Sequence, residues 1–301
     1  MSDKKLMIRG YAKVNLGLDV LKKREDGYHE VKMIMQNIDL YDEITLTAQG
    51  EPGTIELKLD GRCGDLEANE KNLAYRAAKR MFEEAREAGR QIPTGVSINL
   101  TKNIPMAAGL AGGSADCAAV LAGVNRLFAF DFPGEQMMRI GKSLGADVPY
   151  CLLGGTALAE GIGEKLTVLP AAPESLCLIA KPPVDVSTAF VYGNLKASEL
   201  AFHPDIDGQI RALEEGDLAT LAAKMGNVLE TVTEPAYPVI AGIKETMKAC
   251  GAINAMMSGS GPTVFGLFAA KEEMEKAAGL LRQMDPDMRV VETGLCSGKG
   301  E

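Results

Sequence analysis

The 301-residue chain is 46% hydrophobic and 24% charged, with a net charge of −9 at pH 7. This is the composition of an ordinary folded protein, and the length favours two domains over one. The acidic balance argues against non-specific binding to nucleic acid or to anionic membranes. The cysteines form no C-x-x-C pair, the N-terminus has no apolar segment, and no apolar run reaches the ~18 residues of a membrane span. We therefore expect a cytoplasmic protein without nucleic-acid or membrane partners.

The first predicted element spans residues 6–20, where β-branched residues and alternation indicate a strand pair or one bent strand. Side chains two positions apart lie on the same face of a strand. Tyr11, Lys13 and Asn15 therefore share one face. That face is either exposed to solvent or part of a polar site.

A charged loop follows at residues 22–29, with a turn at Asp26-Gly27 that is followed at once by Tyr28 and His29. The chain has only two histidines, so this Tyr-His pair is a candidate binding feature. A structural or exposed histidine is the alternative. The next stretches predict strands of an antiparallel type, at residues 31–37, 43–47 and 54–59.

Residues 70–88 predict the first amphipathic helix, because the apolar residues fall on one face and the charges on the others. Asn69 is its predicted N-cap, and Asn72 lies in the first turn. A strand is predicted at residues 96–101. Lys102 then stands at the mouth of the loop that follows.

That loop, PMAAGLAGGSADCAA at residues 105–119, is the feature around which the chain is organised. Glycine tolerates positive φ, so successive N–H groups can turn inward and form a concavity. Ser114 opens a helical run, and the start of a helix favours an anion. The loop therefore predicts a phosphate site, with a tight strand-to-helix turn as the alternative. It matches neither the P-loop motif nor the G-x-G-x-x-G dinucleotide motif.

A second helix is predicted at residues 134–144, and the sequence GADVP follows it. Proline disfavours helical geometry in the residue before it, so Asp147 is expected at a helix end. Capping and catalysis are both open roles for its carboxylate. A strand is predicted at residues 152–160 with a glycine hairpin after it. We place the domain boundary there, giving domains 1–160 and 161–301.

The second half alternates short strands and helices, which is typical of an α+β sandwich with helices on one sheet face. A glycine-rich segment, SGSGP, lies between two of the predicted strands. The predicted strands are 176–180, 253–257, 263–268 and 288–293, and the predicted helices are 187–195, 217–229, 239–250 and 271–284.

Three motifs taken together carry a resemblance that none carries alone: YAKVNLGL near the N-terminus, PMAAGLAGGSADCAA, and MSGSGPTVF near the C-terminus. In this order and spacing they resemble the GHMP kinase superfamily. The AKVNLGL…DGYHE combination narrows the resemblance to the branch that phosphorylates diphosphocytidyl methylerythritol, and the similarity runs nearly end to end. It implies a two-domain α+β GHMP kinase fold. The N-terminal domain would be ribosomal S5 domain 2-like and hold ATP, and the C-terminal domain would be ferredoxin-like.

The resemblance also implies the reaction: transfer of phosphate from ATP, with Mg²⁺, to the 2-hydroxyl of a small molecule that carries a cytidine diphosphate group. Lys13 and Asp147 match the family's catalytic pair. Asp147 would accept or orient the proton of the attacking hydroxyl. Lys13 would keep that aspartate ionised and stabilise the charge on the transferred group.

The remaining roles follow from the same resemblance. Tyr28, His29 and Tyr192 would hold the cytosine, with Tyr192 preferred to Phe190 because of its spacing from Thr188. The other substrate contacts would come from Asn15, Gly259, Ser260 and Gly261. The ATP contacts would come from Asn72, Lys102, Pro105, Met106, Ala107, Ala108, Gly109, Leu110, Ala111, Gly112, Gly113 and Ser114, with Ser114 near the β- or γ-phosphate.

Small departures from the family pattern are visible. Ala107 and Ala111 stand where some relatives carry glycine, which is tolerable if φ is negative there. Ala115 replaces a second serine, and the sequence identifies no side chain as the metal ligand. A mevalonate or homoserine kinase and a catalytically silent sensor are the alternatives, and we expect a monomer or a weak homodimer.

Overall fold

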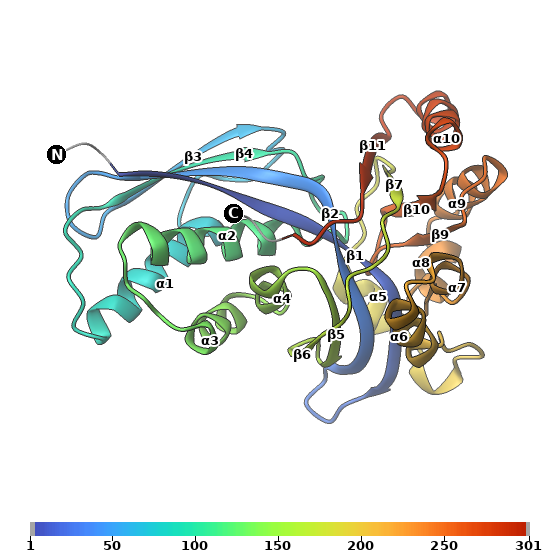
Figure 1. Cartoon of the computed structure of the whole chain (residues 1–301), viewed down its shortest axis with the longest axis horizontal. Coiled ribbons are helices and arrows are strands. Elements are labelled where there is room, and N and C mark those ends of the chain that lie inside the picture. Colours follow the sequence, from blue (N-terminus) through green and yellow to red (C-terminus); the bar gives the residue numbers. More distant parts are fainter. Residues whose placement is uncertain (1–3, 299–301) are drawn as a thin grey trace.

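In a computed structural model, residues 4–298 are described, and they form two lobes that meet at a long, bent pair of strands (Figure 1). The N-terminal lobe holds a seven-stranded sheet of order β3-β4-β2-β1-β8, in which β5 also pairs with β2 and β6 with β5. Its strands are β1 (Lys5–Lys23), β2 (His29–Ala48), β3 (Ile55–Gly61), β4 (Val96–Lys102), β5 (Thr156–Gly161), β6 (Lys165–Val168) and β8 (Gly226–Asn227).

Strands β1 and β2 form one antiparallel hairpin that runs through both lobes. The sequence predicts two separate strands where β2 is continuous. Because β2 is so long, one of its edges pairs with β4 in one half and with β5 in the other. Register shifts lie on either side of Lys13 and Asn15 and bend β1 at that point. This bend is where the functional side chains stand.

Four helices cover one face of the N-terminal sheet. Alanine and leucine faces of the first two pack against Ile44, Leu46 and Ile98 of the sheet. The first helix begins three residues later than predicted, and its N-cap is Asn72 rather than Asn69, because the Asn72 side chain accepts the Ala74 N–H. The helices are α1 (Leu73–Glu87), α2 (Gly112–Leu127), α3 (Gly134–Leu144) and α4 (Val148–Leu153).

The C-terminal lobe is built on a four-stranded antiparallel sheet of order β11-β7-β10-β9. In chain order, helices lie between the first and second strands of this sheet and between the third and fourth. This is the predicted ferredoxin-like arrangement. Its strands are β7 (Leu176–Lys181), β9 (Asn254–Met257), β10 (Val264–Phe268) and β11 (Arg289–Gly294), and its helices are α5 (Thr188–Asn194), α6 (Ile206–Glu215), α7 (Leu218–Ala223), α8 (Glu230–Ala236), α9 (Val239–Ala249) and α10 (Lys271–Met284), with a 3₁₀ turn at Ala197–Glu199.

The predicted domain boundary is wrong by about one hairpin. Strand β6 pairs with β5 inside the first sheet, so residues 161–168 belong to the N-terminal lobe and not to the C-terminal one. Conversely, β8 comes from the second half and pairs with β1. The sequence predicts one helix over residues 217–229. The observed helix α7 ends at Ala223, and Gly226 and Asn227 within the predicted range form the extended strand β8.

Two further differences concern strands. The pair β3–β4 is parallel, although the sequence suggests antiparallel pairing, because α1 forms a crossover between the two strands. Strand β5 begins at Thr156, and Leu152 belongs to α4, which stops where Gly154 and Gly155 both have positive φ.

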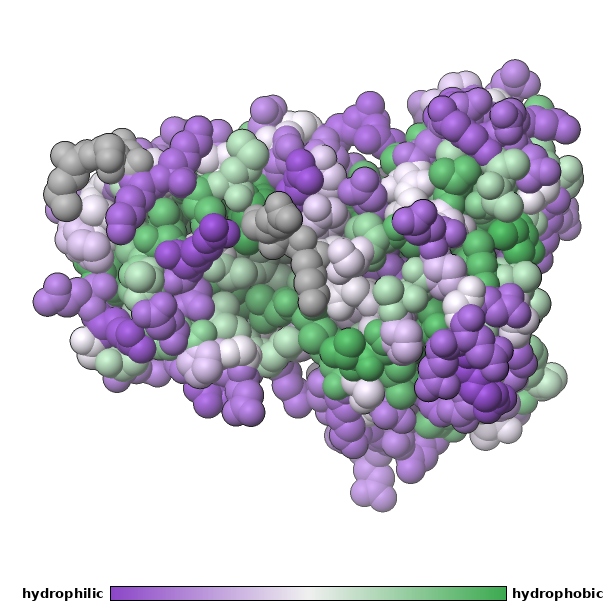
Figure 2. Space-filling model, viewed as in Figure 1, coloured by the Kyte–Doolittle hydropathy of each residue, from purple (hydrophilic) through white to green (hydrophobic). Residues whose placement is uncertain are grey.

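The two sheets are joined by an apolar layer in which Val14 and Leu16 of β1 lie with Ile179 and Phe265 of the second sheet. This layer fixes the lobes relative to each other around the bend in β1. Hydrophilic residues cover the outer helices, and apolar residues show mainly near the middle of the view (Figure 2). Among residues 4–298, no helix is both long and apolar enough to cross a membrane.

Candidate active site

A cavity of about 1020 Å³ lies between the lobes, along the bend in β1. All the residues that the sequence predicts as catalytic, ATP-binding or substrate-binding line this cavity, except Gly261. Gly261 faces the C-terminal core instead, where a Cβ would lie 2.5 Å from the sulfur of Met257. Segments that are far apart in the sequence therefore converge on one space.

The glycine-rich loop connects β4 to α2 and presents the first N–H groups of α2 to the cavity. No side chain caps this helix start, so the N–H groups are free for an anion. Ala107 and Ala111 have φ of 48° and 57°, so the condition of negative φ, under which alanine would be tolerable, is not met. Each alanine carries a cost of about 1–2 kcal/mol in this conformation, which the loop must offset by its packing.

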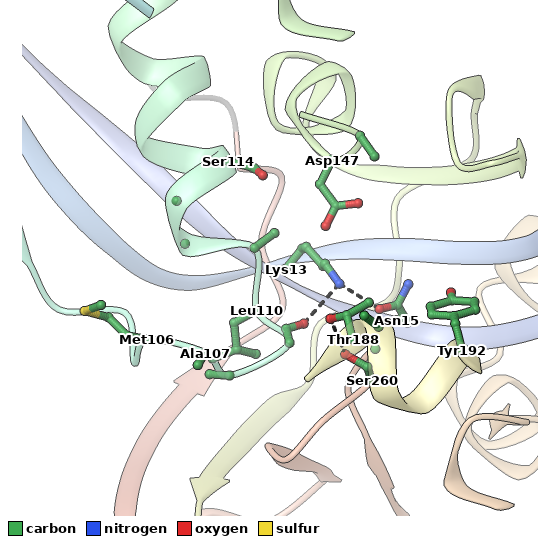
Figure 3. Close-up of a pocket in the computed structure, with 18 of the residues that line it drawn as sticks. Lys13, Asn15, Met106, Ala107, Leu110, Ser114, Asp147, Thr188, Tyr192 and Ser260 are labelled. Atoms are coloured by element: carbon green, nitrogen blue, oxygen red, sulfur yellow. Dashed lines mark hydrogen bonds between the residues drawn. The ribbon is translucent and has the colours of Figure 1, made fainter. Parts of the chain in front are cut away.

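The Lys13 ammonium is buried and held by two neutral acceptors. It donates to Oδ1 of Asn15 at 2.8 Å and to the carbonyl oxygen of Gly109 at 3.0 Å (Figure 3). An ammonium has three N–H donors, so one remains for a ligand. Within the described residues, the hydrogen bonds of this ammonium go to Asn15 and Gly109 and not to Asp147.

Asp147 occupies the N-cap position of α4, and its side chain makes no capping hydrogen bond. Capping, the alternative role, is therefore excluded in this structure. The carboxylate instead points from the start of α4 toward Lys13, on the side of the cavity where the Ser114 hydroxyl also lies (Figure 3). A half-buried carboxylate without a partner in its own element is available to accept a proton from a ligand.

The C-terminal lobe closes the cavity with the loop after β9. Ser258 donates its hydroxyl to the Gly109 carbonyl at 3.0 Å, and Asn227 donates to the Gly259 carbonyl at 2.8 Å. The Ser260 hydroxyl lies 2.9 Å from that of Thr188 at the start of α5. The two glycine-rich segments predicted from the sequence thus touch each other through hydrogen bonds.

An aromatic group lies at the far end of the cavity. The rings of His29 and Tyr192 are 5.2 Å apart between centroids, and Tyr28 stands exposed beside the same end. Burial, followed by the charge of Lys23, lowers the pKa of His29. Burial, followed by the charge of Asp147, raises the pKa of Tyr192 to about 12. Phe190, the alternative to Tyr192, does not line the cavity.

Two residues predicted to contact the nucleotide already have partners in the protein. The Lys102 ammonium forms buried ion pairs with Asp42 and with Asp116. Burial alone would lower the pKa of Lys102, but the two carboxylates outweigh it and raise that pKa. The Asn72 amide is taken up by capping α1 and by donating to the Glu67 carbonyl. Both line the cavity, but the protein already engages two of the three Lys102 donors and the Asn72 amide.

The sequence missed other lining residues, among them Lys23, Thr188 and Asp116. Lys23 lies opposite His29 in the β1–β2 hairpin. The register of the hairpin would therefore have indicated that Lys23 lies near the cavity. Thr188 follows the predicted cap of α5 directly. Asp116 lies in the glycine-rich motif itself, but nothing local shows that its side chain turns toward Lys102.

Comparison with known proteins agrees with this geometry. Family models described as GHMP kinases N terminal domain and GHMP kinases C terminal match residues 72–155 and 209–285. A solved homoserine kinase from Cytophaga hutchinsonii shares the fold with a TM-score of 0.78 at 20% identity, covering 100% of this chain and 98% of that one. The chain belongs to the GHMP kinases.

The similarity is greater within one branch of that family. Proteins named 4-diphosphocytidyl-2-C-methyl-D-erythritol kinase are 50% identical in Lachnospira eligens, over 96% of this chain and 97% of the relative, and 51% identical in Lachnoclostridium phytofermentans, over 90% and 91%. A crystal structure of 4-(cytidine 5'-diphospho)-2C-methyl-D-erythritol kinase superposes with a TM-score of 0.80 at 31% identity, covering 96% of this chain and 99% of that one. This protein is an enzyme of the 4-diphosphocytidyl-2-C-methyl-D-erythritol kinase family.

Proposed function

We propose that this protein transfers the γ-phosphoryl group of ATP to the 2-hydroxyl of 4-diphosphocytidyl-2-C-methyl-D-erythritol, giving the 2-phosphate and ADP. This step belongs to the non-mevalonate route to isoprenoid precursors. The observation that carries the proposal is the cavity itself. It brings together a free helix start, the Lys13 ammonium, the Asp147 carboxylate and an aromatic group.

The free N–H groups of α2 and the loop before it would bind the ATP phosphates. Phosphoryl transfer depends mainly on positioning and on charge stabilisation. The third N–H of Lys13 would contact the transferred group and stabilise the charge that develops on its oxygens. Asp147 would accept the proton that the attacking hydroxyl loses as its oxygen bonds to phosphorus and the bond to ADP breaks.

Mg²⁺ is the usual companion of ATP, and it commonly uses only one or two protein carboxylates together with phosphate oxygens and water. Within residues 4–298, no group of three or more His, Cys, Asp or Glu side chains is placed to hold a metal ion. Mg²⁺ would therefore arrive as part of the MgATP substrate, held mainly by phosphate oxygens and water.

The direct test is ADP release from the purified protein with MgATP and one acceptor at a time. We expect turnover with diphosphocytidyl methylerythritol, and only background rates with mevalonate, homoserine or no acceptor. Phosphorus NMR of the product should show one new phosphomonoester on the 2-hydroxyl. Turnover with mevalonate or homoserine instead would overturn the assigned cytidine end, and no turnover with any acceptor would favour the silent sensor.

Replacing Tyr192 by alanine should raise KM for the substrate by about 5- to 150-fold, which corresponds to the loss of ~1–3 kcal/mol of base stacking. The kcat value should change less than KM, because the ring is assigned to the cytosine and not to the reacting hydroxyl. Steady-state kinetics measures both values. Phe190→Ala is the matched control, since Phe190 is 43% exposed and outside the cavity. Equal effects of the two variants would remove Tyr192 from the binding site.

The affinity for substrate should also depend on pH through His29. The pKa of His29 is lowered from its ordinary value of about 6.5, so the imidazole is neutral at pH 7 and becomes charged as the pH falls through the lowered pKa. A neutral ring can accept a hydrogen bond from the cytosine amino group, and an imidazolium cannot. We therefore expect KM to stay constant from pH 7 to 8 and to rise below pH 6. The His29→Gln variant should lose this rise, and a wild-type KM that falls below pH 6 would contradict the assignment.

A further inference from the structure

Beside the glycine-rich loop lies a buried cluster of three charged side chains, Asp42, Lys102 and Asp116. They come from β2, β4 and α2, so the cluster ties together the two elements that hold the loop and the strand next to them. The side chains of all three are at most 4% exposed. Lys102 and Asp116 also line the cavity. The cluster is therefore part of the wall of the proposed nucleotide site.

The cluster contains two carboxyl groups for one ammonium. Burying an uncompensated charge is costly, and a buried carboxyl group commonly avoids that cost by keeping its proton. The proton belongs on the carboxyl group that has the fewest hydrogen-bond donors around it.

The hydrogen bonds distinguish the two carboxyl groups. Oδ1 of Asp42 accepts the backbone N–H groups of Asn103 at 2.5 Å and Ile104 at 2.9 Å, and Oδ2 accepts Lys102. Asp116 accepts Lys102 through Oδ2 at 2.6 Å, but its Oδ1 is buried and has no partner. Both oxygens of Asp42 thus accept hydrogen bonds, as expected of an ionised carboxylate. Oδ1 of Asp116 accepts none, which favours a protonated oxygen at that position.

We propose that Asp116 works as a neutral carboxylic acid whose Oδ1–H is donated to an anionic oxygen of the polyphosphate bound by the glycine-rich loop. The proposal rests on the proposed use of ATP. A carboxylate at this place in the wall would repel the phosphates, whereas the acid form removes one negative charge and supplies a donor. Asp116 is then a nucleotide-binding group, and Lys102 orients it rather than contacting the phosphates.

The electrostatic surroundings of Asp116 support the acid form. Burial, opposed by Lys102 and reinforced by the Asp42 charge, raises the pKa of Asp116 to about 8. Arrival of a polyanion would favour the proton further. The titratable groups that interact electrostatically with the cluster include Cys63 after β3, Cys117 of α2 and Cys151 of α4. Asp60 of β3 acts on Cys63, and Arg76 of α1 acts on Cys117.

The first measurement is the affinity of the wild-type enzyme for the non-hydrolysable analogue adenylyl imidodiphosphate with Mg²⁺, from pH 6.5 to 9.5, by calorimetry. Because only the protonated form of Asp116 would donate, the dissociation constant should be level below pH 7. It should then rise toward tenfold per pH unit above pH 8 to 9. At pH 8.5, binding should also take up a fraction of a proton, which two buffers of different ionisation enthalpy reveal. No variant is needed for this readout, so it does not depend on the folding of a mutant.

The matched variant is Asp116→Asn, which keeps an acceptor for Lys102 and offers an N–H where the acid has its O–H. It should bind the analogue within about fivefold of wild type at pH 7, with a level pH profile and no proton uptake. Asp116→Ala, which lacks the donor, should bind at least tenfold more weakly at every pH. Thermal unfolding checks that both variants fold.

Two results would overturn the proposal. One is a wild-type affinity that is independent of pH or improves above pH 8. The other is an Asp116→Asn variant that loses affinity as much as Asp116→Ala does, since either result means that the carboxylate is the working form. All of these measurements omit the acceptor substrate. Failure of the proposed reaction would instead appear as normal nucleotide binding without phosphorylation of diphosphocytidyl methylerythritol.

Discussion

Asparagine in place of Asp147 is expected to lower kcat by about 10³-fold, within the ~10²–10⁴-fold range of general acid–base catalysis. The amide has nearly the shape of the carboxylate but cannot accept the proton of the attacking hydroxyl. The loss should fall on the chemical step, because the Asp147 side chain makes no capping hydrogen bond to α4 that the substitution would remove. Single-turnover kinetics with saturating MgATP and acceptor measures it. Binding of MgATP alone should stay within about threefold of wild type.

The control for this prediction is Asp287→Asn, the same chemical change at an exposed position outside the cavity. It should leave kcat and the unfolding temperature unchanged. If Asp147→Asn keeps a near-wild-type rate in the chemical step, the carboxylate is not the proton acceptor, and Lys13 would have to act by positioning and charge alone. A large loss of MgATP affinity would instead indicate that Asp147 belongs to the nucleotide site.

Much of the fold could be predicted because its elements have strong local patterns. Helix α10 has the predicted bounds, and β4 and α3 lie where the alternation and the helical spacing indicate. The errors occur where distant contacts decide. Strand β8 has only two residues and exists because β1 offers an edge, and α6 is amphipathic but was missed between the loops around it. The domain boundary was misplaced because β6 pairs backward with β5.

The sequence predicted most of the named residues that line the cavity, but not which of them contact one another. Motif residues such as Lys13 and Asp147 line the cavity as a group, because each motif places its backbone against the same space. One of the two carboxylate partners of Lys102, however, is Asp42, which lies 60 residues earlier, and no local pattern links these two residues. The same holds for Ala107 and Ala111, whose positive φ follows from the path of the loop and not from the preference of alanine.

Replacing Gly109 by alanine is expected to lower kcat/KM by at least about 10²-fold, because this glycine lies where three parts of the site meet. Its carbonyl oxygen accepts both the Lys13 ammonium and the Ser258 hydroxyl. Its φ is 71°, and a Cβ would lie 2.2 Å from the backbone carbonyl oxygen of Ser258. Backbone cannot move aside as a flexible side chain can, so the loop and the C-terminal lobe must separate. A displacement of about 1 Å near reacting groups can cost ~10²-fold in rate.

An alanine at position 109 would have both an unfavourable positive φ and a clash with Ser258. A second glycine with positive φ but no close neighbour separates the two effects. Gly89, which follows α1, has φ of 67° and open space around a Cβ. Gly89→Ala should therefore cost only the ~1–2 kcal/mol of the left-handed conformation and leave the kinetics unchanged. Gly109→Ala should cost that amount plus the ~1–3 kcal/mol of overpacking, measured by denaturant unfolding. Equal loss of stability in the two variants, with wild-type kinetics for Gly109→Ala, would mean that the contact with Ser258 is not what holds Lys13 and the loop in place.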